Sequence, residues 1–358
     1  MNNKANMVYY IEKENKINNK VINKSSNTLE PLLNIVKDKS YREIIIYATG
    51  SSANAANSAR LYMQNVLQIP VSIKEPSLSK SYEMILSDDS LYFAISQGGH
   101  SYSTIELVKE IQAKGYNILT ITSNMNSPIA KDSHNVLDIG MGIEEMPFVT
   151  AGQTATVIYL WLIALKIASI QHKLSKDDYD KKVNEIKNVV SKANTVIKKT
   201  DEWYEKEKFQ LLKAKRFVAI SYGSGYGVVK EAETKFTETI RVPSHGHELE
   251  EYMHGPYIGL NKDDYIFCVS INGKLEERLL LLKSFLDRHV EHTYIISTGN
   301  NGTGKHDLNF GLDVDEFLSP ILATIPFHMI SWYISQEHGI DLGSSSYPDF
   351  DKMLKSKV

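Results

Sequence analysis

Residues 231–256 bring together side chains that could transfer protons. Lys235 and Glu238 stand three positions apart, near the end of a stretch whose apolar periodicity predicts a helix that stops at Pro243. Side chains at this spacing leave a helix from nearly the same face. His254 follows in a His-Gly-Pro sequence, which favours a tight turn that would orient the imidazole. A carboxylate, an ammonium and an imidazole could together move protons on a substrate. The competing interpretation of the Lys–Glu pair is a solvated ion pair.

The composition is that of an ordinary globular protein. The 358 residues are 42% hydrophobic and 23% charged, with a formal net charge of -3. This length predicts two domains, and the charge gives no basic surface for nucleic acid. The single cysteine, Cys268, excludes an intramolecular disulfide and favours a reducing cytoplasm. The N-terminus lacks the apolar core of a signal peptide, and the apolar run Thr156–Ala168 is too short to span a membrane, so we expect no membrane association and interpret the run as a buried helix.

Strands alternate with helices after a leading helical segment. This alternation predicts an α/β fold with a parallel, doubly wound sheet and right-handed crossovers. Glycine- and serine-rich turns follow two of the expected strands, at residues 49–52 and 96–104. The strands of the first half are expected at Glu43–Ala48, Val71–Lys74, Leu91–Ile95, Ile118–Thr122 and Val136–Gly140.

The second half of the chain repeats the first. Phe217–Ser221, Ile266–Ser270 and Tyr294–Thr298 match three strands of the first half at a nearly constant offset of about 174 residues, which indicates a duplicated domain. We therefore expect five parts. They are an N-terminal helical segment (1–30), a first domain (31–170), a helical connector (171–210), a second domain (211–340) and a C-terminal tail (341–358).

The two turns of the first half are candidate phosphate sites. Each follows a strand and opens a helix, whose N-terminus offers unpaired N–H groups and a partial positive charge. In the alternative interpretation, their hydroxyls are only helix caps. The matching second-half turn, Asn272-Gly273-Lys274, lacks the hydroxyls, so we expect one phosphate site per chain.

In combination, these motifs resemble the sugar isomerase (SIS) domain family. Residues 96–104 align with its Ser-Gln-Ser-Gly-Glu-Thr-x-x-Thr phosphate loop, and Gly50-Ser51-Ser52 aligns with its first loop. Residues 235–238 match its Lys-x-x-Glu, and 254–256 its His-Gly-Pro. From about residue 30 onward, the chain is similar to the isomerase portion of glucosamine-fructose-6-phosphate aminotransferase and to fructosamine-6-phosphate deglycases. The fold that this resemblance implies is two tandem SIS domains.

The resemblance also implies roles for individual residues. Glu238 would move a proton between C1 and C2 of the sugar, His254 would open the ring, and Lys235 would stabilise the enolate-like oxygen. Lys352, or a neighbouring lysine, would be the functional lysine of the tail. The phosphosugar would be bound by Gly50, Ser51, Ser52, Ser96, Gln97, Gly98, Gly99, Ser101, Thr104 and Thr150.

The sequence departs from the family pattern at three places. Gly98 replaces a phosphate-binding serine, and His100 and Ser101 replace glutamate and threonine. The family's Ala-Ser-Thr-Lys loop reads as residues 149–152 here, without its lysine. These changes bear on the substrate more than on the fold.

The implied activity is cleavage of a carbon–nitrogen bond in a 6-phosphorylated aminosugar or fructosamine, by a deglycase or deaminase. The alternatives are an aldose–ketose phosphosugar isomerase and a non-catalytic phosphosugar sensor. We expect no metal, no cofactor and no glutaminase activity. The family's histidine reaches a neighbouring site, which implies a homodimer with His254 in that role.

Two rival sites are weaker. A zinc site at His245, His247 and His254 lacks helical metal-ligand spacing, because these histidines are expected in a loop. A dinucleotide site at residues 223–227 has its third glycine too early.

Overall fold

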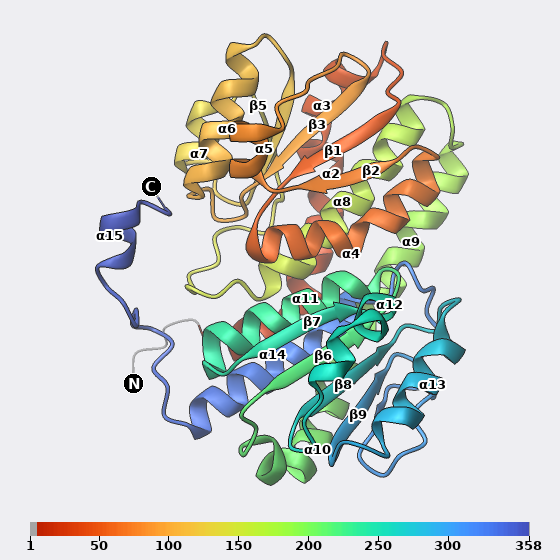
Figure 1. Cartoon of the computed structure of the whole chain (residues 1–358). Coiled ribbons are helices and arrows are strands. Elements are labelled where there is room, and N and C mark those ends of the chain that lie inside the picture. Colours follow the sequence, from red (N-terminus) through yellow and green to blue (C-terminus); the bar gives the residue numbers. More distant parts are fainter. Residues whose placement is uncertain (1–5, 358) are drawn as a thin grey trace. The chain divides into compact units, whose positions relative to one another are not determined.

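Each half of the chain forms a five-stranded parallel sheet with helices on its faces (Figure 1). The structure is a computed structural model that describes residues 6–357. The chain divides into two units. We call Lys16–Glu145, Ala151–Lys187 and Ser344–Val358 the N-terminal unit, and Met1–Asn15, Met146–Thr150 and Asn188–Gly343 the C-terminal unit.

The N-terminal unit has the strand order β2-β1-β3-β4-β5. All of its strand pairs are parallel, as the alternation of strands and helices predicts. The strands are β1 Glu43–Tyr47, β2 Val71–Lys74, β3 Ser90–Ile95, β4 Ile118–Thr122 and β5 Asn135–Asp138. The helices are α2 Glu14–Thr28, α3 Glu30–Val36, α4 Gly50–Leu67, α5 Pro76–Tyr82, α6 Tyr102–Ala113, α7 Pro128–Asp132, α8 Ala151–Ile170, α9 Lys176–Ser191 and α15 Phe350–Leu354.

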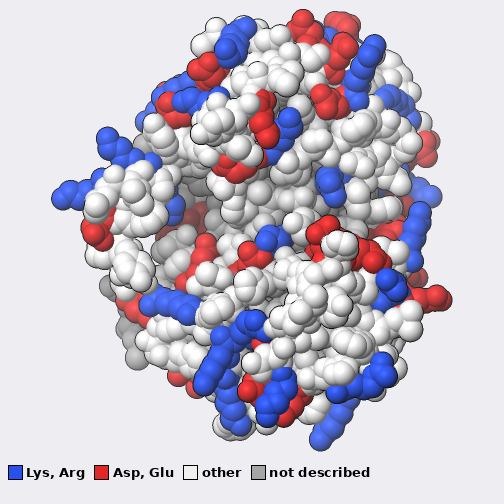
Figure 2. All heavy atoms as spheres, in the orientation of Figure 1, with Lys and Arg blue, Asp and Glu red and all other residues white. Residues whose placement is uncertain are grey.

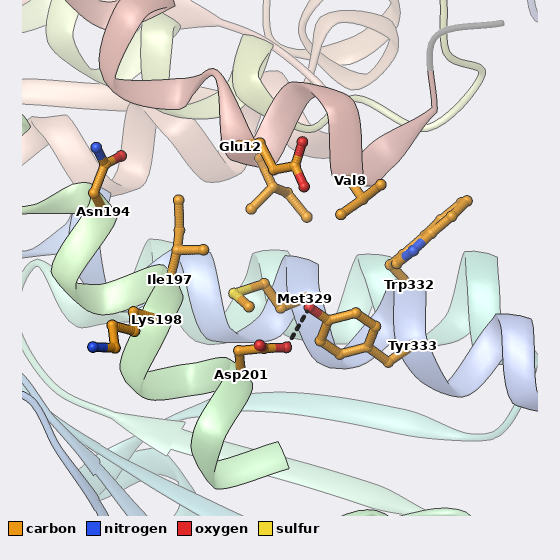
Figure 3. Close-up of a pocket in the computed structure, with 10 residues that line it drawn as sticks. Val8, Glu12, Asn194, Ile197, Lys198, Asp201, Met329, Trp332 and Tyr333 are labelled. Atoms are coloured by element: carbon orange, nitrogen blue, oxygen red, sulfur yellow. Dashed lines mark hydrogen bonds between the residues drawn. The ribbon is translucent and has the colours of Figure 1, made fainter. Parts of the chain in front are cut away.

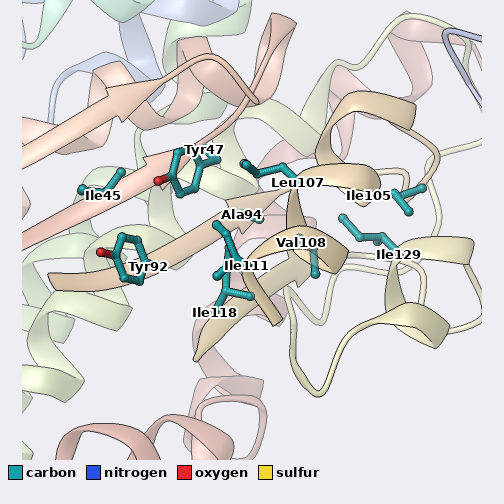
Figure 4. Packing of buried hydrophobic residues seen from close by; sticks show 10 residues of the cluster. All are labelled: Ile45, Tyr47, Tyr92, Ala94, Ile105, Leu107, Val108, Ile111, Ile118 and Ile129. Atoms are coloured by element: carbon teal, nitrogen blue, oxygen red, sulfur yellow. The ribbon is translucent and has the colours of Figure 1, made fainter. Parts of the chain in front are cut away.

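A hydrophobic cluster fixes α6 on its sheet (Figure 4). Leu107, Val108 and Ile111 recur at the spacing of one helix face and are fully buried. They pack with side chains of β1 and β3, including Tyr47 and Tyr92, whose rings stack 6.3 Å apart. Because α6 is held in this way, its N-terminus has a defined position beyond the end of β3.

The C-terminal unit repeats this topology. Its sheet has the order β10-β9-β8-β6-β7, which read from the other edge is the order of the first sheet. The strands are β6 Phe217–Ser221, β7 Ser244–Glu248, β8 Tyr265–Ser270, β9 His292–Ser297 and β10 Leu308–Asn309. The helices are α1 Met7–Glu12, α10 Ala193–Leu211, α11 Gly225–Lys235, α12 Leu249–His254, α13 Glu276–Leu286 and α14 Pro320–Glu337, with a π-helical turn η1 Phe236–Ile240 and a 3-10 turn η2 Pro256–Gly259.

Aromatic side chains fill the core beneath α11 and α14. The ring of Phe236 lies 4.6 Å from that of Phe217 and 5.8 Å from that of Phe327, measured between centroids. The opposite face of the same sheet carries Cys268, which is fully buried. Burial raises the pKa of the Cys268 thiol to about 12.

Helix α8 is longer than the apolar run in the sequence suggests. It has 20 residues, and its length and composition alone would allow it to cross a membrane. However, 83% of its most apolar window is buried inside the protein, which is typical of a core helix. Figure 2 shows positive and negative side chains intermixed on the face drawn, in keeping with the small net charge.

Candidate active site

Two helices of the N-terminal unit begin beyond the carboxyl ends of adjacent strands. Helix α4 follows β1 and helix α6 follows β3, and β1 pairs directly with β3. Strand order reverses between these two strands, because β2 lies on one side and β4 on the other. Open α/β sheets bind ligands at such a reversal, and helix N-termini favour anions. The structure thus brings the two predicted phosphate turns to one edge of one sheet.

The turn before α6 depends on Gly99. Its backbone has φ +81°, which is the left-handed region that favours glycine. A Cβ atom there would lie 2.1 Å from the Ser127 hydroxyl oxygen, whereas one at Gly98 would meet nothing within 4 Å. The Gly99 amide donates to the Ser96 carbonyl at 2.9 Å, which closes the turn. Gly99 therefore shapes the loop, and Gly98 leaves space beside it.

Hydroxyl groups line the same turn. The Ser101 amide donates to the Ser96 hydroxyl at 3.3 Å, and the Thr104 hydroxyl donates to the Ser101 hydroxyl at 2.9 Å. Thr104 is completely buried, so it orients Ser101 from beneath. A serine hydroxyl that accepts one hydrogen bond keeps its own proton for another acceptor. In the first turn of α4, Ser51 and Ser52 are half-buried.

Gln97 is directed into the protein rather than out of the loop. Its side-chain amide donates to the Ser123 hydroxyl at 3.3 Å and approaches the Met141 sulfur at 3.6 Å. A Cβ atom at Gly152 would lie 2.6 Å from the Gln97 amide nitrogen, so the start of α8 packs tightly on this side chain. In this structure Gln97 supports the loop from within.

The start of α8 is already occupied by a carboxylate. Glu144 accepts hydrogen bonds from the amides of Ala151 at 3.2 Å and Gly152 at 2.9 Å. It fills the place that an anion takes at a helix N-terminus. Thr150, a predicted ligand, is completely buried, and its hydroxyl donates to the Phe148 carbonyl at 3.1 Å.

The C-terminal tail pairs with the phosphate turn, which the sequence did not reveal. The Tyr102 amide donates to the Ser356 carbonyl at 3.2 Å, and Ser101 and Lys357 form an antiparallel bridge. Lys352 lies one turn earlier, in α15, and is exposed. Lys355 ends that helix in a left-handed conformation with φ +51°. Several tail lysines are thus carried on a segment anchored at the turn.

The predicted catalytic pair lies at a change of helix type in the C-terminal unit. Lys235 is the last residue of α11, and Glu238 lies in the π-helical turn that follows. Such turns are rare and occur often at functional sites. The Lys235 ammonium donates to the Glu238 carboxylate at 2.7 Å. The Lys235 side chain is 1% exposed and that of Glu238 is 38% exposed, so a buried cation holds an accessible carboxylate.

A second carboxylate balances the buried ammonium. Glu231 lies one helical turn before Lys235, and its Oε1 is 3.6 Å from the Lys235 Nζ. A buried charge is costly unless it is paired, and here two carboxylates share one ammonium. Glu231 was not among the predicted site residues. The sequence did contain a signal for this contact, because Glu231 stands four positions before Lys235 on the same face of the helix.

The segment after η1 is regular, which corrects the loop expected for the three histidines. His245 and His247 lie on β7, the edge strand, and their rings are 6.0 Å apart. His254 is the last residue of α12 and precedes the 3-10 turn η2, so a helix end rather than a tight turn positions it. Among the residues described, no group of three or more His, Cys, Asp or Glu side chains could hold a metal ion.

The turn that matches the phosphate loop in the second sheet is acidic. There, Glu276 accepts hydrogen bonds from the hydroxyls of Tyr222 at 2.7 Å and Ser270 at 2.9 Å. A Cβ atom at Gly273 would lie 2.2 Å from a Glu316 carboxylate oxygen. Two carboxylates beside this turn would repel a phosphate.

A pocket of about 410 Å³ in the C-terminal unit is lined by α1, α10 and α14 (Figure 3). Its polar groups include Glu12 and Asp201, and Asp201 accepts a hydrogen bond from Tyr333 at 2.9 Å. The predicted site residues are not among the described residues that line it. This pocket therefore contains neither the turns predicted to bind phosphate nor the Lys235–Glu238 pair.

The family model for the SIS domain matches residues 39–166 and 210–316, and the chain belongs to this family. Each matched segment contains one of the two parallel sheets. This confirms the two tandem domains expected from the internal repeat. The chain therefore has an SIS-type fold, of the kind found in phosphosugar isomerases.

Individual relatives agree with this assignment. The chain is 22% identical over 307 residues to glutamine–fructose-6-phosphate aminotransferase (isomerizing) of Clostridium perfringens, covering 84% of this chain and 50% of that protein. The chain thus spans about half the length of the curated relatives it matches.

Two solved structures share the fold over almost the whole chain. One is a Clostridium difficile 630 protein provisionally named a phosphosugar isomerase, with TM-score 0.88, 26% identity and 98% of each chain covered. The other is glucosamine-6-phosphate deaminase of Thermotoga maritima, with TM-score 0.71, 20% identity, and 94% of this chain and 97% of that chain covered.

Proposed function

We propose that this protein cleaves the carbon–nitrogen bond of a 6-phosphorylated aminosugar or fructosamine. The observation that carries the proposal is the accessible Glu238 carboxylate held at 2.7 Å by a buried ammonium. The hydroxyl-lined turns at α4 and α6 supply the phosphate site, so binding energy from the phosphate orients the reacting carbons. The deaminase among the proteins of similar fold supports the choice of an amino substrate.

The reaction needs only proton transfers and water. With a C1-amino ketose, Glu238 takes a proton from C1 to give an enaminol and returns it to C2, which leaves an imine at C1. Water then adds to the imine carbon, the C–N bond breaks, and the hexose 6-phosphate and the amine are released. His254 opens the ring beforehand, Lys235 stabilises the developing oxyanion, and a tail lysine completes the site. Each positioned proton transfer contributes on the order of a hundred- to ten-thousand-fold in rate.

The test is to incubate the pure protein with glucosamine 6-phosphate, fructose 6-phosphate and several fructosamine 6-phosphates. Released amine and sugar phosphate are measured over time. Amine release supports the proposal, and aldose–ketose conversion without amine release makes the protein an isomerase. Tight phosphosugar binding without turnover makes it a sensor.

Glu238→Gln is expected to lower kcat by about a hundredfold or more, because the amide cannot accept the carbon-bound proton. Glu250→Gln, which removes an exposed carboxylate paired with Arg278, is the matched control and leaves kcat unchanged. Normal turnover by the Glu238 variant would exclude Glu238 as the proton carrier.

A further inference from the structure

A buried histidine joins the Glu231–Lys235–Glu238 group. The side chains of His328, on α14, and Glu231 are both 0% exposed, and the His328 Nε2 lies 3.4 Å from the Glu231 Oε1. The same carboxylate oxygen lies 3.6 Å from the Lys235 Nζ. One oxygen atom of Glu231 is therefore shared between the imidazole and the ammonium.

The tautomer of His328 follows from its surroundings. Its Nε2 faces a carboxylate, which only accepts hydrogen bonds, and its Nδ1 has no hydrogen-bond partner among the described residues. The Nε2 must therefore carry the ring proton, and it donates a hydrogen bond to the Glu231 carboxylate. Burial lowers the pKa of His328, so the ring is neutral near pH 7. The charged groups that face it are Glu231 and Lys235 from α11 and Glu238 from η1.

Packing between helices fixes the position of this imidazole. The neighbouring Phe327 ring lies 5.8 Å from that of Phe236 and 5.7 Å from that of Phe267. The Thr239 hydroxyl donates to the Lys235 carbonyl at 2.7 Å and also lies 3.3 Å from the Ser331 carbonyl, so it brings η1 against the next turn of α14. The donor on α14 is thus held in register with the π-helical turn that carries Glu238.

The ammonium of Lys235 has two carboxylates within reach, at 2.7 Å and 3.6 Å. Glu231 accepts a hydrogen bond from the His328 imidazole inside the protein. A buried carboxylate that loses a hydrogen-bond donor costs free energy, because water does not replace that donor. Without the His328 donor, Glu231 would draw the ammonium toward itself. Glu238 would then lose the cation that holds it.

We propose that His328 is a positioning residue for proton transfer, whose Nε2–H satisfies Glu231 and so keeps the Lys235 ammonium on Glu238. This inference rests on the proposed function, because it concerns the carboxylate assigned there as the proton carrier. His328 itself touches neither substrate nor reacting atoms in this role.

Two isosteric variants test the proposal. The amide nitrogen of His328→Gln reaches the place of Nε2, whereas that of His328→Asn reaches only the place of Nδ1. We expect the Gln variant to keep kcat within about threefold and the Asn variant to lose about tenfold or more. The Asn variant should also move the acid limb of the kcat profile to higher pH, because its proton-transferring carboxylate has lost a cation. KM should change little in both variants.

Crystal structures of the two variants give a readout that needs no turnover. The distance from Lys235 Nζ to Glu238 Oε2 should stay near 2.7 Å in the Gln variant, and the ammonium should move to Glu231 in the Asn variant. Equal rates, pH profiles and ammonium positions in both variants would overturn the proposal. If the wild-type protein turns over none of the substrates, the proposed function fails, and the structures alone decide the role of His328.

Discussion

At the scale of single residues, the candidate site divides into groups that can reach a substrate and groups that hold them. The Glu238 carboxylate is accessible, and the Lys235 ammonium beneath it is buried. Ser101 is only partly buried, and Thr104, which donates to it, is fully buried. In both units, a buried partner restricts the orientation of a more accessible group, which is what preorganised catalysis requires.

The Ser101 hydroxyl is expected to act mainly in substrate binding. Ser101→Ala should raise KM for the phosphorylated substrate by about tenfold to a hundredfold, since a hydrogen bond to a charged group contributes about 1.5–3 kcal/mol. Steady-state kinetics measure this change. Ser103→Ala, also in the first turn of α6, is the control and should leave KM unchanged. A fall in kcat with constant KM would argue against a phosphate-binding role.

At the scale of elements, the predicted phosphate turn connects β3 to α6, and we expect it to tolerate few substitutions. Its closing hydrogen bond runs from Gly99 to Ser96, and the hydrophobic face of α6 fixes the helix that the turn opens. The tail adds a third segment, because the Tyr102 amide donates to the Ser356 carbonyl. The loop, the helix and the tail therefore depend on each other.

A pair of glycine variants separates the shape of the turn from the space beside it. Gly99→Ala should lower the free energy of unfolding by about 1–3 kcal/mol and weaken phosphosugar binding, because its backbone has φ +81° and its Cβ would contact Ser127. Gly98→Ala meets no atom within 4 Å and should change stability by less than about 1 kcal/mol. Urea denaturation and calorimetric binding measure both effects. Equal losses in the two variants would contradict this account of the turn.

At the scale of the whole molecule, two copies of one topology have diverged in their chemistry. The first copy presents hydroxyl-lined turns at the ends of β1 and β3, and the second presents Glu276 and Glu316 at the matching turn. The second copy instead carries the Lys235–Glu238 pair. This difference between the two copies supports the prediction of one phosphate site per chain.

Mixing two inactive variants tests the proposed homodimer. If His254 serves the neighbouring subunit, a dimer of one Glu238→Gln and one His254→Asn chain contains one site in which both residues are intact. Equal mixtures, unfolded and refolded together, should recover about a quarter of the wild-type activity. Recovery close to zero would place His254 and Glu238 in the same subunit's site, and gel filtration checks the assembly itself.

The stability of the protein should fall in mild acid. Burial lowers the pKa values of His247, His292 and His328 below their ordinary value of 6.5. The unfolded chain therefore binds more protons than the folded one below about pH 6.5, and the free energy of unfolding decreases as pH falls. The fully buried His328 should contribute about 1.4 kcal/mol per pH unit in that range. Urea titrations at several pH values measure the free energy of unfolding. Its dependence on pH should be weaker in His328→Gln than in the wild-type protein, and an unchanged dependence would contradict the burial of His328 as a neutral ring.

The sequence alone determined the fold class, the duplication and the positions of the two turns that are predicted to bind phosphate. These follow from local patterns, since buried strands are continuous apolar runs and helix starts carry small polar residues. It missed β7, because Ser-His-Gly-His-Glu has no apolar pattern and becomes a strand only by pairing with β6. It also treated residues 231–240 as one helix, whereas the structure has a π-helical turn at Phe236–Ile240 that packs against α14.

Only the tertiary structure decided which groups support the chemistry. His328 and the Ser356 carbonyl each meet a predicted site residue or its loop through long-range contacts that the sequence pattern does not encode. His328 lies 97 positions from Glu231 along the chain, and Ser356 lies even farther from Tyr102. Local periodicity specifies which face of an element is buried, whereas the identity of the partner on that face is set by how distant elements pack together.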